Sequence, residues 1–216
     1  MARSGSAIFL IFFLVGYQFA GAANARDRIL QEPGYLVPIE ESSPILAPFQ
    51  HVRFCLRYPS ECRSDPAENE RINLNEETAK LLDLVNREVN GAISPTIKGY
   101  GSDLQEGWTI SPGVGDCNDY AVTKRHKLLQ NGLPAKALRL SVVKTATGIG
   151  HLVLVVVTTK GDLVLDNLAE TIRPWQNTDY HWLKIQSAAD ARLWYEVKAA
   201  SPSVSQANRK LRVADR

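Results

Sequence analysis

The residues best placed to do chemistry are a cysteine, a histidine and an aspartate in the second half of the chain. Cys117 follows Gly115 and Asp116 and begins a segment of helical composition that ends before Gly132. A thiol on the first turn of a helix lies beside unpaired backbone N–H groups and the positive end of the helix dipole, which favour the reactive thiolate. The alternative is an inert core cysteine, so the remaining residues must show whether the thiol has partners.

A cysteine nucleophile needs a base, and His151 is the best candidate among the four histidines. It stands at the first position of a predicted strand, directly after the turn at Gly148-Ile149-Gly150. His126 follows Cys117 on the same helix, about 13 Å along its axis, and cannot reach the thiol. The other two histidines lie in the N-terminal arm and near the C-terminal end. We therefore predict His151 as the base.

The base needs an orienting acceptor, and Asp166 lies at the end of the next predicted strand. If the two strands are antiparallel neighbours, His151 and Asp166 lie on the same face of the sheet in any register in which the numbers of paired residues add up to an odd sum. They are directly opposite if the hairpin is centred between Thr158 and Thr159. The turn signal at Lys160-Gly161 instead places Val155 opposite Asp166, about 13 Å from His151 along the strand. Both registers stay open, as does an aspartate that only caps the next turn.

The N-terminus predicts a secretory signal peptide over residues 1–25. Arg3 precedes the apolar run Ala7–Val15, and Ala23-Asn24-Ala25 supplies the small residues of a cleavage site. An uncleaved membrane anchor is the alternative, but the apolar run is short for a spanning helix. We therefore expect cleavage after Ala25, a periplasmic or secreted protein, and no membrane insertion after cleavage.

Export gives the three cysteines different roles. Cys55 and Cys62 are separated by six residues that include Pro59, a turn former, and are the natural disulfide in an oxidising compartment. Cys117 then remains as the free thiol. Neither a CxxC motif nor a cluster of cysteine and histidine suggests a zinc site, and we expect no organic cofactor. A net charge of +2 gives no basic field for nucleic acid.

The elements that must position these residues predict an α+β domain over residues 73–200. An arm rich in proline, with a disulfide-pinned loop over residues 49–62, precedes it at residues 26–72, and a basic tail follows at residues 201–216. Periodicity and capping signals predict helices at Glu76–Asn90 and Cys117–Asn131 and strands at 135–143, 151–158, 163–166 and 180–185, with a helix or strand at 188–197.

The segment from Ile93 to Gly115 is rich in glycine and reads as a loop. Its aromatic residues Tyr100 and Trp108 are candidates to wall a substrate cleft beside Cys117. The equally open alternative is that they pack beneath the loop.

The combined pattern is similar to that of the bacterial transglutaminase-like cysteine proteinases. It consists of Gly-Asp-Cys-x-Asp-Tyr-Ala with Lys124, Gly-His-Leu-Val-Leu 34 residues after the cysteine, and Leu-Asp-Asn-Leu 15 residues after the histidine. The resemblance covers about residues 73–197. It implies a papain-like, transglutaminase-core fold, with helices packed on an antiparallel sheet and the cysteine at a helix N-terminus. It also implies that Cys117 is the nucleophile, His151 the base and then acid, and Asp166 the orienting residue.

The resemblance further implies an exported cysteine endopeptidase that cuts a protein substrate. In the family this substrate can be a surface adhesin, cleaved in biofilm release under an inner-membrane regulatory receptor. It implies calcium held by acidic residues next to the nucleophile, which map to Asp116, Asn118 and Asp119. Asn118 stands where an acidic residue is common, although its amide oxygen can also bind calcium, and Asp116 has a sufficient role as a helix cap. The alternatives are acyl transfer of the transglutaminase type and a catalytically silent binding module.

Overall fold

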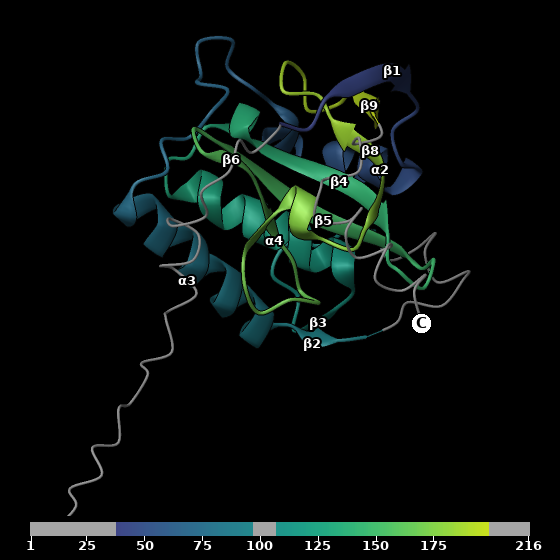
Figure 1. The fold of residues 1–216 in the computed structure, drawn as a ribbon. Helices are drawn as coiled ribbons and strands as arrows, with labels where there is room; N and C mark the ends of the chain where they lie inside the picture. The colour runs from purple at the N-terminus through teal and green to yellow at the C-terminus, as the bar shows by residue number, and fades with distance from the viewer. Residues whose placement is uncertain (1–37, 97–106, 199–216) are drawn as a thin grey trace, which may run out of the picture.

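The computed structural model describes residues 38–96 and 107–198. In these residues one antiparallel sheet has the strand order β1-β9-β8-β4-β5-β6-β7, and a small parallel pair joins β2 to β3 (Figure 1). The strands are β1 (Glu41–Ile45), β2 (Ser94–Pro95), β3 (Val114–Gly115), β4 (Leu138–Lys144), β5 (Gly150–Thr158), β6 (Gly161–Leu165), β7 (Arg173–Pro174), β8 (His181–Gln186) and β9 (Trp194–Val197). The helices are α2 (Phe49–Arg57), α3 (Glu76–Ala92) and α4 (Cys117–Gln130), with short 3₁₀ turns at Pro59–Cys62, Ala135–Ala137 and Trp175–Asn177.

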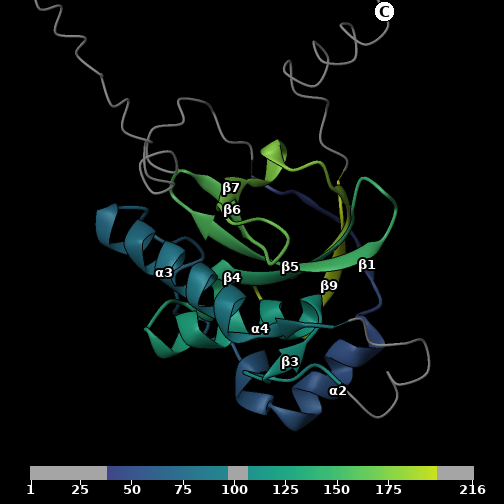
Figure 2. The same ribbon diagram turned by 90° about the horizontal axis from the view of Figure 1, so that it is seen from below.

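The predicted α+β arrangement is confirmed, and the helices cover one side of the sheet (Figure 2). Residues 151–158 of β5 are all buried, and α4 packs on one face of this central strand. In α4 the residues from Asp119 through Arg125, and Leu128, are also buried, so burial extends around the helix. The cysteine therefore begins a helix that lies in the interior of the domain.

Local signals explain α3. Asn75 caps the helix by accepting a hydrogen bond from the Thr78 N–H, and acidic residues occupy the first turn. Leu82, Val85 and Val89 are spaced along one face and are buried against the core. The helix predicted at Glu76–Asn90 is confirmed and continues to Ala92.

The segment predicted as a disulfide-pinned loop is instead a helix followed by a 3₁₀ turn. In α2, His51 and Phe54 are buried while Val52 and Leu56 on the other side are exposed, which is a helical pattern. The aromatic and histidine contacts of that inner face, made with distant parts of the chain, stabilise the helix. Such tertiary contacts are not visible in a nine-residue window.

Two further segments are resolved as strands. β1, within the proline-rich arm, pairs with β9 at the edge of the sheet, and β9 occupies the end of the segment predicted as helix or strand. Within the described part of the chain, no helix is both long and apolar enough to span a bilayer. The predicted signal peptide, the basic tail and Tyr100 lie outside the described residues.

Candidate active site

The N-terminus of α4 is held by reciprocal caps on both sides of Cys117. The Asp116 carboxylate accepts the N–H of Asn118 at 3.0 Å, and the Asp119 carboxylate accepts the N–H of Asp116 at 3.0 Å. This arrangement is a capping box, which satisfies backbone donors that the first turn cannot pair internally. The side chain of Cys117, the free cysteine of the described residues, is thereby presented from a fixed first turn.

Asp119 is the deeper member of this cap. Its side chain is fully buried, and its second oxygen accepts the N–H of Thr109 at 2.8 Å, which ties the preceding loop to α4. A Cβ at Gly115 would lie 2.7 Å from Asp119 Oδ2. Gly115 is therefore required because the Asp119 carboxylate occupies the space that a side chain would need.

His151 and Asp166 meet across the β5–β6 hairpin. Thr158 pairs with Gly161 and Leu154 with Leu165, so the register lies midway between the two sequence alternatives. Extended by one step, it places position 166 diagonally from His151 on the same face, a separation that long side chains span. His151 Nε2 lies 2.7 Å from Asp166 Oδ1. The odd-sum rule for a shared face holds, whereas neither predicted pairing is correct.

Asp166 is 4% exposed, and three more hydrogen-bond donors hold it in place. The Leu168 N–H donates to Oδ1 at 3.0 Å, and the Tyr180 hydroxyl donates to Oδ2. The Asn90 amide donates to the Asp166 carbonyl at 3.0 Å. The Tyr180 ring also packs edge-on against His151, with centroids 5.7 Å apart. Tyr180 is not among the residues predicted from the sequence, because nothing in its local pattern indicates a partner in another segment.

These contacts set the charges of the pair. Burial disfavours the His151 imidazolium, but hydrogen bonds to Asp166 and Cys117 and their negative charges outweigh it and raise its pKa to about 9. Burial likewise disfavours the Asp166 carboxylate, but the His151 hydrogen bond and charge, with the Leu168 and Tyr180 donors, lower the Asp166 pKa. Since Nε2 of His151 is engaged by Asp166, Nδ1 is the ring nitrogen left for the thiol.

Cys117 and His151 open onto a cavity of about 770 Å³. Asp116 and Asn118 line it beside the cysteine, and Ile149 lines it beside the histidine. The remaining lining residues are Pro95, Thr96, Gly115, Tyr120, Thr145, Thr147, Gly150, Asn167 and Leu168. This volume is typical of a pocket for a small ligand or a side chain. The Cys117 thiol and the His151 imidazole line the cavity, whereas Asp166 is not among its lining residues.

Trp108 is placed away from this cavity. Its side chain is buried, and its ring lies 5.7 Å from that of His51 and 6.1 Å from that of Phe54. Among the described residues that line the cavity, Trp108 does not occur. The position matches the alternative in which the aromatic side chain packs beneath the loop.

The three predicted calcium ligands differ in their fit to an ion. Asp116 and Asn118 face the cavity with partly exposed side chains. Asp119 does not fit, because it is fully buried and both of its oxygens accept backbone N–H groups. Calcium requires six to eight oxygen ligands. Of the predicted set, only Asp116 and Asn118 could hold the ion.

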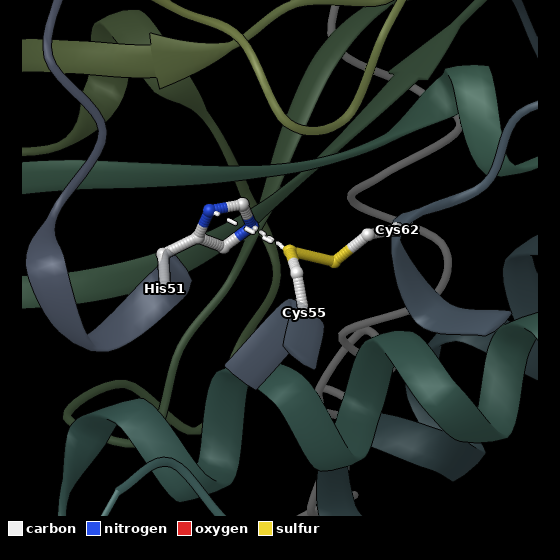
Figure 3. A group of neighbouring side chains, drawn as sticks. All are labelled: His51, Cys55 and Cys62. Carbon is white, nitrogen blue, oxygen red and sulfur yellow. Dashed lines mark hydrogen bonds between the residues drawn. A yellow bond between two sulfur atoms is a disulfide. The ribbon is translucent and has the colours of Figure 1, made fainter. Parts of the chain in front are cut away.

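The predicted Cys55–Cys62 disulfide is present, with an S–S distance of 2.04 Å. His51 Nε2 lies 3.5 Å from Cys55 Sγ (Figure 3). Among the described residues, these three form the one group of three or more His, Cys, Asp or Glu side chains whose ligand atoms lie close enough together to hold a metal ion. Because both sulfurs are in a disulfide, they are not thiolate ligands, and the group is a structural link between α2 and the following turn.

The fold and the thiol at a helix N-terminus define the class of transglutaminase-like cysteine peptidases. The model of the bacterial transglutaminase-like cysteine proteinase family (BTLCP) matches residues 41–202, and the chain belongs to this family. Among curated proteins, none matches the chain.

Solved structures of LapG from Legionella pneumophila are similar to this chain. The calcium-bound form is 25% identical, with a TM-score of 0.48, and the match covers 63% of this chain and 80% of that one. The EGTA-treated form is 21% identical, with a TM-score of 0.42, and the match covers 63% and 78%. A third LapG structure is 24% identical, with a TM-score of 0.44, and the match covers 63% and 77%.

Proposed function

We propose that this cysteine peptidase cleaves its protein substrate with a catalytic triad of Cys117, His151 and Asp166. The observation that carries the proposal is the 2.7 Å contact between His151 Nε2 and Asp166 Oδ1. It leaves the other ring nitrogen of His151 for the thiol at the start of α4. Asp166 orients the imidazole and stabilises its charged form, which is the role of the third group in such a triad.

The proposed reaction has two steps. Cys117 Sγ attacks the peptide carbonyl carbon, the C–N bond breaks, and the amine nitrogen takes the proton of the His151 imidazolium. The products are a thioester on Cys117 and a neutral imidazole. His151 then accepts a proton from water as hydroxide attacks the thioester, the C–S bond breaks, and the thiolate and imidazolium are restored.

The backbone N–H of Cys117 is the proposed donor to the oxyanion. The capping box engages the N–H groups of Asp116, Asn118 and Asp119. The N–H of Cys117 lies between them on the first turn, where the helix itself offers no carbonyl acceptor. A donor of this kind stabilises the charge that develops on the carbonyl oxygen.

We also propose that the enzyme acts outside the cytoplasm, with a mature chain that begins at Arg26. The Cys55–Cys62 disulfide supports this site of action, because such bonds persist in oxidising compartments. A surface or periplasmic protein such as an adhesin is the proposed substrate, with an inner-membrane receptor as a proposed regulator. Both rest on the family resemblance. The proposed calcium ligands in this chain are Asp116 and Asn118, and the ion would supply positive charge at the cavity edge.

Turnover and labelling test the triad. We expect iodoacetamide to alkylate Cys117 rapidly at mildly acidic pH without reduction, and Cys117→Ala to abolish turnover while leaving the melting temperature nearly unchanged. Slow alkylation, or adducts on Cys55 or Cys62, would contradict the proposal, and so would collapse of the Cys117→Ala fold. New protein N-termini, compared between cells with the native enzyme and with Cys117→Ala, identify the substrate. A fluorescent amine in the same reactions separates hydrolysis from acyl transfer, because only transfer incorporates it into protein.

A further inference from the structure

A buried lysine on the helix that begins with Cys117 has no role in the reaction described above. Lys124 is seven residues after Cys117, two turns along α4 and on the same side of the helix. Its residue is 0% exposed, and no described residue accepts a hydrogen bond from its Nζ. A buried ammonium without a partner is costly. Its presence therefore needs a reason other than stability.

The charged residue that acts on Lys124 is Asp166, a member of the proposed triad. Burial lowers the Lys124 pKa to about 7, and the negative charge of Asp166 opposes that fall. The helix α3 packs against α4, and it carries the neutral amide side chains of Asn86 and Asn90. These donate to the carbonyls of Glu170 and Asp166, while their own oxygens are buried without a partner.

The neighbouring buried cation on α4 serves a different purpose. Arg125 donates to the Leu138 carbonyl at 2.9 Å and to the Glu61 side chain at 3.2 Å, so its charge is paired. It joins α4 to the turn that contains Cys62. Arg125 is thus a structural ion pair and a matched control for Lys124.

We propose that Lys124 is a positioning residue of the active site, whose buried ammonium balances the Asp166 carboxylate and so helps His151 to release its proton. The inference rests on the proposed function. In the resting enzyme the thiolate, the imidazolium and the Asp166 carboxylate together carry one negative charge. After acylation the sulfur and the imidazole are neutral, and Asp166 is the remaining buried charge. Lys124 neutralises that charge in the acyl-enzyme.

The sign of the effect on His151 follows from electrostatics. The groups that face His151 are Asp166, Cys117 on α4 and Tyr180. Removing the ammonium leaves the Asp166 carboxylate less balanced. A less balanced carboxylate favours the protonated ring of His151. The His151 pKa should therefore rise by about one unit, a tenfold change in proton affinity, and His151 should become a weaker acid toward the leaving amine.

The test is a histidine NMR titration in the Lys124→Met and Lys124→Gln variants, with His151 assigned by its absence in His151→Gln. We expect its midpoint to rise by about one pH unit in both variants. We expect kcat to fall with little change in KM. We expect a melting temperature close to that of the native protein, because losing a buried ammonium without a hydrogen-bond acceptor offsets the weaker balance of Asp166. Arg125→Met should lower the melting temperature and leave the His151 midpoint unchanged.

A His151 midpoint unchanged in both Lys124 variants overturns the proposal, as does an equal shift in Arg125→Met. A lower melting temperature with an unchanged midpoint assigns Lys124 a purely structural role and also overturns it. The titration requires no substrate, so it decides the role of Lys124 even if the peptidase triad is refuted. If the midpoint is unchanged while Cys117→Ala abolishes turnover, the triad stands and only this inference fails.

Discussion

Replacing Tyr180 by phenylalanine removes one hydrogen bond from the proposed orienting carboxylate and leaves the ring that packs on His151. Asp166 is 4% exposed, so water does not replace the lost donor. A hydrogen bond to a buried charged group contributes about 1.5–3 kcal/mol, and this is the loss we expect in the free energy of unfolding at pH 7. The imidazole should also be held less firmly, so kcat/KM should fall about tenfold.

The effect of Tyr180→Phe depends on pH with a definite sign. Asp166 has a folded-state pKa below its ordinary value, so its carboxylate stabilises the fold above the unfolded pKa of about 3.9. That stabilisation is lost as the pH falls through the lower, folded pKa. Without the Tyr180 donor the folded pKa of Asp166 rises. The difference in stability between the native protein and the variant should be complete at pH 7 and should shrink below about pH 4.

Urea unfolding followed by circular dichroism at a series of pH values measures this difference, and peptide turnover measures kcat/KM. Tyr195→Phe is the control, because Tyr195 lies in β9 opposite Pro44 and Ile185 rather than beside Asp166. A loss below about 0.5 kcal/mol at pH 7 would be typical of an ordinary surface change. That result, or a difference that does not shrink as the pH falls below about 4, would refute the assigned contact.

Three further changes test the support of the site. Replacing Cys55 and Cys62 together by alanine should cost about 2–3 kcal/mol of stability in urea unfolding, from the entropy of an eight-residue loop; an unchanged midpoint would contradict this. Gly115→Ala should cost about 1–3 kcal/mol and slow alkylation of the catalytic thiol, because its Cβ would overlap Asp119 Oδ2; full activity and stability would show that the cap adjusts freely. Asn118→Asp should bind calcium at least about tenfold more tightly in calorimetric titration, because a carboxylate replaces an amide; equal affinity would remove residue 118 from the ligand set.

Local signals were sufficient for much of the fold. Asn75 caps α3, and the turn at Gly132 follows α4, because capping and left-handed turns depend on a few adjacent residues. β5 was predicted from its continuous apolar run, which a fully buried strand requires. The disulfide followed from cysteine spacing and the predicted compartment.

The remaining features depend on contacts that are distant in sequence. The β5–β6 hairpin turns at Thr159-Lys160, one residue from each sequence alternative, where the Thr159 N–H donates to the carbonyl of the distant Ile72. α2 forms because its inner face meets side chains such as Trp194, which lies 143 residues from His51. Tyr180 reaches Asp166 from the segment before β8. In each case the partner is chosen by tertiary packing, which no local pattern encodes.

The adjacent cations of α4 show how stability and chemistry can be told apart within one turn of helix. Arg125 is buried with a carboxylate and carbonyls as acceptors, so its removal would leave Glu61 buried with one fewer partner and should destabilise the fold. Lys124 is equally buried, yet its ammonium has no described acceptor, so its removal should not destabilise the fold. A residue that stability alone would replace, and whose charged form the Asp166 carboxylate favours, is the expected signature of a group kept for the reaction.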